Sequence, residues 1–88
     1  MTVEEAKAAL RSTDPGVISL QSTIRKQTEA IATYEKGLAE MGQDHPGRAR
    51  MENLLRPERQ GQQEAQASLA RLVQTRARLQ ETIEKMEA

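Results

Sequence analysis

Apolar and small residues recur at alternating steps of four and three residues along the last half of the chain. This seam comprises Met51, Leu55, Ala65, Leu69, Leu72, Leu79, Ile83 and Met86. A repeat of 3.5 residues places such side chains on one face of a helix that packs along a second helix. Glu58, Gln62 and Arg76 are polar residues at seam positions. The pattern predicts a long helix over residues 46–87.

A matching seam comes earlier in the chain. It comprises Val17, Leu20, Ile24, Gln27, Ile31, Tyr34, Leu38 and Met41, and it predicts a helix over residues 15–41. A shorter helix is expected over residues 2–12, with Thr2 as its N-cap. Pro15 lacks a backbone donor and disfavours helix at the residue before it, so the short helix should be broken off at Pro15. Asp14 is the expected cap of the second helix.

The stretch from residue 42 to 47 is the strongest turn signal. We expect Gly42 to end the second helix in a left-handed conformation. Asp44 or His45 should cap the third helix, with Pro46 at its start. A link this short makes the two long helices antiparallel. Within the third helix, Pro57 predicts a kink, with a complete break as the alternative.

Antiparallel seams predict which residues face each other. Across a short-linked pair, facing residues should have numbers that sum to about 89. The expected pairs include Leu38 with Met51, Tyr34 with Leu55, Ile24 with Ala65, Leu20 with Leu69, and Leu10 with Leu79. Gln27 should lie opposite Gln62, where the two amides could pair. Arg76 should lie beside Thr13 and Asp14.

These patterns predict an all-α fold with one domain over residues 1–88. The main interpretation is a long antiparallel helical hairpin, a coiled coil, with its short first helix broken off at Pro15. A compact three-helix bundle is the alternative, because the break allows the short helix to fold elsewhere. Only 36% of residues are hydrophobic and there is one aromatic residue, which fits a thin core. Ile18, Leu54 and Val73 lie off the seam and could form a second contact stripe for a partner.

The charge pattern argues against nucleic acid as a partner. The chain has 13 basic and 13 acidic residues, and its formal net charge is zero. Arg71, Arg76 and Arg78 form a local basic cluster, but Glu64 and Glu81 flank it. Nucleic-acid-binding domains usually show a basic excess or stripe.

Targeting and redox signals are also absent. The chain has no cysteine and no apolar run near the roughly 20 residues of a membrane span. Its N-terminus lacks the basic start and apolar core of a signal peptide. We therefore expect a cytoplasmic protein if the chain is complete, and no location can be assigned if it is an excised domain.

No motif predicts catalysis. His45 is the only histidine, and only Asp44 lies near it as a second metal ligand. There is no glycine-rich phosphate loop and no nucleophile–base arrangement. We expect no enzyme activity, cofactor, metal or small-molecule substrate. Gln27, Gln62 and Arg76 are expected to fix the register of the two arms instead.

Two resemblances follow from short motifs. Asp14-Pro15, then Ile18 and Leu20, and the Gly42–Pro46 turn together resemble the periplasmic coiled-coil segment of bacterial polysaccharide chain-length determinant proteins, which often carry a Gly-x-x-His-Pro turn between two long helices. This resemblance covers residues 14–60 and implies an excised segment or a stand-alone relative, since those proteins are longer and have flanking membrane helices. The chain is also similar to the Rho-binding antiparallel coiled-coil repeat. That similarity lies at Ile24–Lys26, Gly37–Met41, Leu54-Leu55-Arg56 and the Leu69/Leu72 spacing.

Two in-register seams without site chemistry favour a non-catalytic helical module that binds a protein partner or a second copy of itself. Three other functions stay open from the sequence. These are a small chaperone or assembly factor of a larger bacterial complex, an excised segment of a polysaccharide chain-length regulator, and a nucleic-acid-binding accessory protein.

Overall fold

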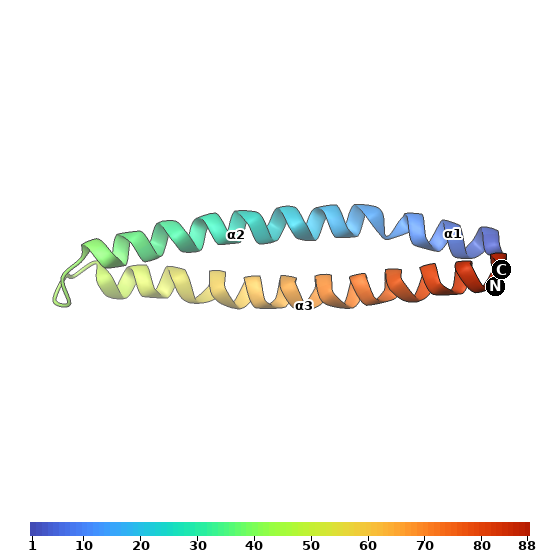
Figure 1. Ribbon diagram of the computed structural model, residues 1–88. Helices are drawn as coiled ribbons and strands as arrows, with labels where there is room; N and C mark the ends of the chain where they lie inside the picture. The colour runs from blue at the N-terminus through green and yellow to red at the C-terminus, as the bar shows by residue number, and fades with distance from the viewer.

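The computed structural model describes residues 1–88 as an elongated two-armed hairpin. It contains three helices, α1 (Val3–Ser12), α2 (Asp14–Glu40) and α3 (Arg48–Glu87). α1 and α2 follow each other along one arm, and α3 returns along both, so that the two termini lie at the same end (Figure 1). The molecule measures 65 × 15 × 15 Å. The predicted all-α hairpin is confirmed, and the alternative of a compact three-helix bundle is wrong.

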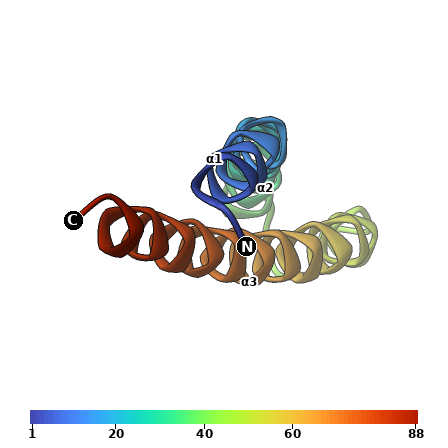
Figure 2. The same ribbon diagram turned by 90° about the vertical axis from the view of Figure 1, so that its right-hand side faces the viewer.

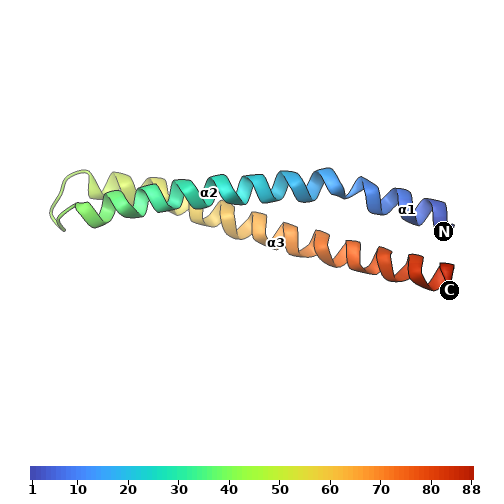
Figure 3. The same ribbon diagram turned by 45° about the horizontal axis from the view of Figure 1, so that its top comes forward.

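The two arms wind around each other. Figures 2 and 3 show that the arm made by α1 and α2 crosses α3 at an angle. Such winding keeps a 3.5-residue seam in contact with its partner over many turns, because a straight helix has 3.6 residues per turn. The seam observed in the sequence is therefore long enough to hold the arms together from end to end.

The start of α1 follows from its first residues. The Thr2 hydroxyl accepts a hydrogen bond from the Glu5 backbone N–H at 3.1 Å. Glu4 and Glu5 lie in the first turn, where the helix dipole favours negative charge. The predicted Thr2 cap is confirmed.

The predicted break at Pro15 is a short interruption of the first arm, one residue long. Thr13 alone separates α1 from α2, and its backbone angles (φ −82°, ψ −17°) are right-handed helical. The Leu10 carbonyl accepts hydrogen bonds from both the hydroxyl and the backbone N–H of Thr13, at 2.6 Å and 3.2 Å. The prediction that Asp14 caps α2 is wrong, because Asp14 is the first helical residue and Thr13 precedes it without a side-chain cap bond.

The turn is built from right-handed and extended backbone only. No residue in the chain has a positive φ, so the predicted left-handed Gly42 is wrong. Met41 ends α2 with an extended conformation (φ −92°, ψ 137°). Two backbone hydrogen bonds then close successive turns, from His45 N to the Gly42 carbonyl at 3.0 Å and from Arg48 N to the His45 carbonyl at 3.1 Å.

The predicted caps of α3 are also wrong. Gly47 occupies the N-cap position, and neither Asp44 nor His45 caps the helix. His45 instead accepts a hydrogen bond at Nδ1 from the Gly47 N–H at 2.9 Å, which stiffens the loop. α3 begins two residues after Pro46 rather than at it.

Arg48 satisfies the carbonyl groups left open where α2 ends. Its guanidinium donates to the Leu38 carbonyl at 3.3 Å and to the Met41 carbonyl at 3.5 Å. The last carbonyls of a helix have no partners within the helix, and a cation there also interacts favourably with the helix dipole. The Arg48 side chain, from the next helix, thus caps the end of α2, the role that the sequence pattern assigned to Gly42.

α3 continues through Pro57 as one helix of 40 residues. The alternative of a complete break is therefore wrong. Pro57 and Asn53, whose carbonyl loses its helical donor at Pro57, are both exposed. Water can solvate that carbonyl, so a single proline on the outer face does not end the helix.

The predicted register is confirmed by contacts between the arms. Arg76 contacts Thr13, and Gln62 contacts Thr28; these pairs of numbers sum to 89 and 90. A Cβ atom on Gly37 would lie 3.1 Å from Met51 Cε, and this pair sums to 88. The two seams therefore face each other as the heptad pattern requires.

The hairpin buries little of its apolar surface. Only Ala6, Leu55, Ala65 and Ile83 are buried, and none of them is in α2. The other seam residues are half-buried, except for Met86, which is 40% exposed. A radius of gyration of 19.7 Å compares with about 12 Å for a compact domain of this length. The long arms thus leave most seam side chains partly open to solvent.

Candidate interaction surface

Two glutamines at the centre of the seam lie at the predicted register but do not pair. Gln62 Nε2 donates to the Thr28 hydroxyl at 2.6 Å. Gln27 Oε1 is buried and has no hydrogen-bond partner. The predicted amide pair of Gln27 and Gln62 is wrong, because Thr28 next to Gln27 offers the closer acceptor.

Arg76 lies where the sequence places it. Its guanidinium donates to the Thr13 hydroxyl at 2.8 Å and forms an ion pair with the Asp14 carboxylate. This contact joins α3 to the bend between α1 and α2. Because Arg76 is engaged there, it does not share an outer surface with Arg71 and Arg78, which lie seven residues apart on another face of α3.

Three glycines within the helices receive side chains from the opposite arm. A Cβ atom on Gly16 or Gly37 would lie 3.1 Å from Leu72 or Met51, and one on Gly61 would lie 2.9 Å from Gln27 Nε2. Gly37 is therefore closely packed against α3. All three glycines precede a seam position, so they fall on one side of the hairpin.

The residues beside the seam form two different edges. The charged edge consists of the residues that follow the second seam position of each repeat. It comprises Lys7, Asp14, Gln21, Thr28 and Glu35 on the first arm, and Glu52, Arg59, Gln66, Val73, Gln80 and Glu87 on α3. Ion pairs join the arms along it, between Arg59 and Glu35 and between Lys7 and Glu87, each at 2.7 Å.

The opposite edge carries no charge. This uncharged edge consists of the residues that precede the first seam position of each repeat. It comprises Ala9, Gly16, Thr23, Ala30 and Gly37 on the first arm, and Leu54, Gly61, Ser68, Thr75 and Thr82 on α3. Apart from Leu54, all of these residues are small.

The three off-seam apolar residues do not form one stripe. Ile18, Leu54 and Val73 are 66%, 45% and 51% exposed. Val73 belongs to the charged edge, and Ile18, one residue after Val17, lies on the same side of the hairpin. Leu54 belongs to the uncharged edge. The expected second contact stripe is therefore divided between two sides.

The structure offers few elements of site chemistry. One open hollow of about 350 Å³ is lined by Leu38, Glu52, Leu55, Arg56 and Arg59. No group of three or more His, Cys, Asp or Glu side chains is arranged to hold a metal ion. None of the helices combines the length and apolar character that a membrane crossing requires.

The chain matches no protein-family model, no curated protein and no solved structure. The resemblances to chain-length determinant proteins and to the Rho-binding repeat rest on their short motifs alone and stay predictions.

Proposed function

We propose that this chain is a non-catalytic helical interaction module that binds a protein, either a different chain or a second copy of itself, through the faces of its hairpin. The observation that carries the proposal is the mismatch between length and burial. Two arms span 65 Å, yet only four residues are buried. A protein bound along the hairpin would cover the half-exposed seam.

The surface area supports the proposal. The chain exposes 6492 Å², whereas a compact monomer of the same mass exposes about 5,200 Å². The excess of about 1,300 Å² per chain is larger than the share of one partner in a typical specific interface, about 800 Å². Covering it would supply the burial that a two-helix hairpin lacks.

Sedimentation equilibrium over a wide concentration range, with circular dichroism on the same samples, tests the proposal. We expect a helical protein that associates with itself, or that retains a partner which can be identified and reconstituted from purified components. Leu20→Asp and Leu69→Asp, at facing seam positions, should each cost about 2–4 kcal/mol and abolish association together with helicity. The proposal fails if both variants keep the helicity and every association of the wild type.

The same samples distinguish the other functions. A poorly helical monomer that folds only with an identified partner would favour a chaperone or assembly factor. Steep salt dependence of binding to DNA or RNA, reduced by Arg71→Gln and Arg78→Gln, would favour a nucleic-acid accessory role. Arg56→Gln, an exposed arginine 15 residues before Arg71 on α3, is the matched control for charge.

A further inference from the structure

We propose that the partner of the uncharged edge is a second copy of this chain, related by a two-fold axis along the length of the hairpin. This inference rests on the proposed function and specifies its partner. The two hairpins would form a four-helix bundle with both turns at the same end. In this arrangement α3 of each copy packs against α1 and α2 of the other.

The uncharged edge is the side suited to become a bundle core. A four-helix bundle buries the seam together with one neighbouring edge. The charged edge cannot be buried in this way without removing Lys7, Glu35, Arg59 and Glu87 from water, which is costly even for paired charges. The uncharged edge carries no such penalty. Its one large side chain, Leu54, is 45% exposed and is therefore available for contact with the other copy.

The symmetry fixes the register of the dimer without further assumption. A rotation about the long axis does not move residues along that axis. Each residue of α3 therefore lies beside the partner residues that share its level, and these are the residues whose numbers sum to about 90 with its own. The hairpin register is already confirmed, so the pairs across the dimer can be read from it.

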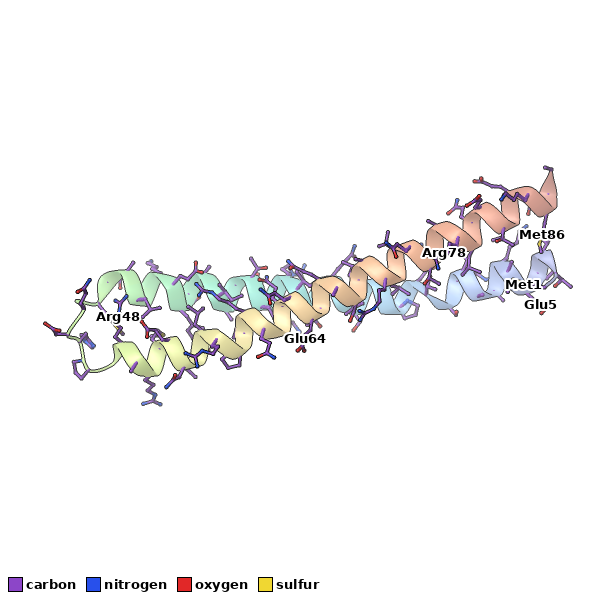
Figure 4. The ribbon with its side chains drawn as sticks, turned by 90° about the horizontal axis from the view of Figure 1, so that it is seen from below. Met1, Glu5, Arg48, Glu64, Arg78 and Met86 are labelled. Atoms are coloured by element: carbon purple, nitrogen blue, oxygen red, sulfur yellow. The ribbon has the colours of Figure 1, made fainter.

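The outer rows that border the uncharged edge test this arrangement. The first arm carries Glu5, Ser12, Ser19, Lys26, Thr33 and Glu40, and α3 carries Arg50, Pro57, Glu64, Arg71, Arg78 and Lys85. Figure 4 shows three of them, Glu5 on α1 and Glu64 and Arg78 on α3. At a sum of 90, every pair of two charged residues is opposite in sign. These pairs are Glu5 with Lys85, Lys26 with Glu64, and Glu40 with Arg50.

The same charges have little to bind within one chain. On the charged edge, the ion pairs of Lys7 with Glu87 and of Glu35 with Arg59 join the two arms of the same chain. Along the outer rows, the only ion pair is that of Lys85 with Glu81, four residues away on the same helix. Glu5, Lys26, Glu40, Arg50 and Glu64 form none. The outer rows are thus complementary to a second copy rather than to each other.

The alternative dimer, with the hairpins end to end reversed, places like charges together. It packs α3 on α3, so that Arg50 faces Lys85 of the other copy. On the first arm, Glu5 faces Glu40. Like charges at such positions are destabilising. Charge therefore favours the arrangement in which both turns lie at the same end.

Aspartate substitutions at two exposed apolar residues test which side of the hairpin forms the dimer contact. Leu54→Asp lies on the uncharged edge and should convert a dimer into a monomer that keeps its helicity in circular dichroism. Ile18→Asp is the matched control, because Ile18 is more exposed and lies on the other side. It should leave the dimer intact in sedimentation equilibrium. Equal effects of the two variants would overturn the proposal.

Charge reversal tests the pairs across the dimer. Lys26→Glu should weaken dimerisation about tenfold, because the contact with Glu64 occurs twice in the dimer. The double variant Lys26→Glu with Glu64→Lys should restore it. Lys36→Glu makes the same charge change on the outer face of α2 and should have no effect. A double variant that is weaker than Lys26→Glu alone would contradict the pairing.

A spin label at the turn tests the orientation. The chain contains no cysteine, so Gln43→Cys provides a single site. Two turns at the same end should give a label distance within about 30 Å, whereas reversed hairpins would separate the labels by about the 65 Å length of the molecule. The longer distance would overturn this arrangement and leave self-association standing. A wild type that stays a helical monomer at high concentration would overturn the dimer and leave a different protein as the partner.

Discussion

At the scale of single residues, Gln27 is a weak point of the seam. Its side-chain oxygen is buried without a hydrogen-bond partner, and an unsatisfied buried acceptor costs about 1–3 kcal/mol. Gln27→Met keeps the length of the side chain and removes the acceptor, so we expect it to raise the free energy of unfolding by about 1 kcal/mol. Urea unfolding at fixed protein concentration measures the change.

The control for this change is Gln21→Met. Gln21 is exposed on the charged edge, and exposed substitutions usually change stability by less than about 0.5 kcal/mol. If both methionine variants shift the unfolding midpoint equally, the effect belongs to added apolar surface and not to the unsatisfied oxygen of Gln27.

Lys7 gives a residue-scale prediction with pH. A hydrogen bond from its ammonium group to the Glu87 carboxylate, and then the charge of that carboxylate, raise the pKa of Lys7 above its ordinary value of 10.5. A raised pKa in the folded state means that the ion pair stabilises the fold fully below the unfolded pKa and loses this effect as the pH rises through the folded pKa. Thermal unfolding should show a small gap between wild type and Lys7→Gln that is constant near neutral pH and disappears above pH 10.5. A gap that persists at the highest pH would exclude the ion pair as its cause.

Residue periodicity predicted which residues of the two arms face each other, but not which groups hydrogen-bond to the helix ends. The heptad spacing placed Arg76 beside Thr13 and Asp14 because register depends only on counting residues from the turn. The caps of the long helices were predicted from local signals at Gly42, Asp44 and His45. At the end of α2, Arg48 from the following helix reaches back to the open carbonyls, and nothing in the local pattern reveals a contact made across the loop. At the start of α3, His45 accepts a hydrogen bond from the Gly47 N–H within the loop instead of capping the helix.

At the scale of elements, α3 stays continuous although it contains a proline in its interior. Pro57 removes a backbone hydrogen bond in the interior of the helix, and proline there is about 3 kcal/mol less favourable than alanine. We expect Pro57→Ala to raise the free energy of unfolding by about 1–3 kcal/mol, since α3 is already helical at this position. Urea unfolding followed by circular dichroism measures the gain.

The control for Pro57→Ala is an alanine substitution at a nearby residue that is not proline. Gln60→Ala alters an exposed position one turn later without restoring a hydrogen bond, so its effect should stay within about 0.5 kcal/mol. A Pro57→Ala variant no more stable than Gln60→Ala would mean that the helix had already relieved the cost of the proline by other means.

Element boundaries were predictable from the sequence to within about two residues. The nature of each interruption was not. Proline lowers helix stability at both Pro15 and Pro57, yet one site bends the arm and the other lies within a continuous helix. The difference comes from neighbours: Thr13 and Arg76 stabilise the bend, whereas Pro57 faces solvent on an outer face.

At the scale of the whole molecule, the hairpin followed from the agreement of two seam lengths about one short turn. The division of the exposed apolar residues between two sides did not. Ile18, Leu54 and Val73 appeared as one set because each lies off the seam. They differ in position relative to it: Leu54 precedes a seam residue, whereas Ile18 and Val73 follow one. In antiparallel arms the edge of each residue follows from whether it precedes or follows a seam position, so the division could have been read from the seams themselves. The register adds the level of each residue along the hairpin.

The register also determines how far apart in sequence the contacts are, and this has a consequence for folding kinetics. Arg48 and Leu38 lie 10 residues apart, whereas Arg76 and Thr13 lie 63 apart. The entropy cost of closing a loop rises with its length, so contacts near the turn should form first and the arms should then close toward the termini. In stopped-flow experiments at low protein concentration, Met51→Ala should slow folding, and Ile83→Ala should accelerate unfolding with little effect on folding. The reverse assignment would mean that the hairpin nucleates at its open end, where both termini lie.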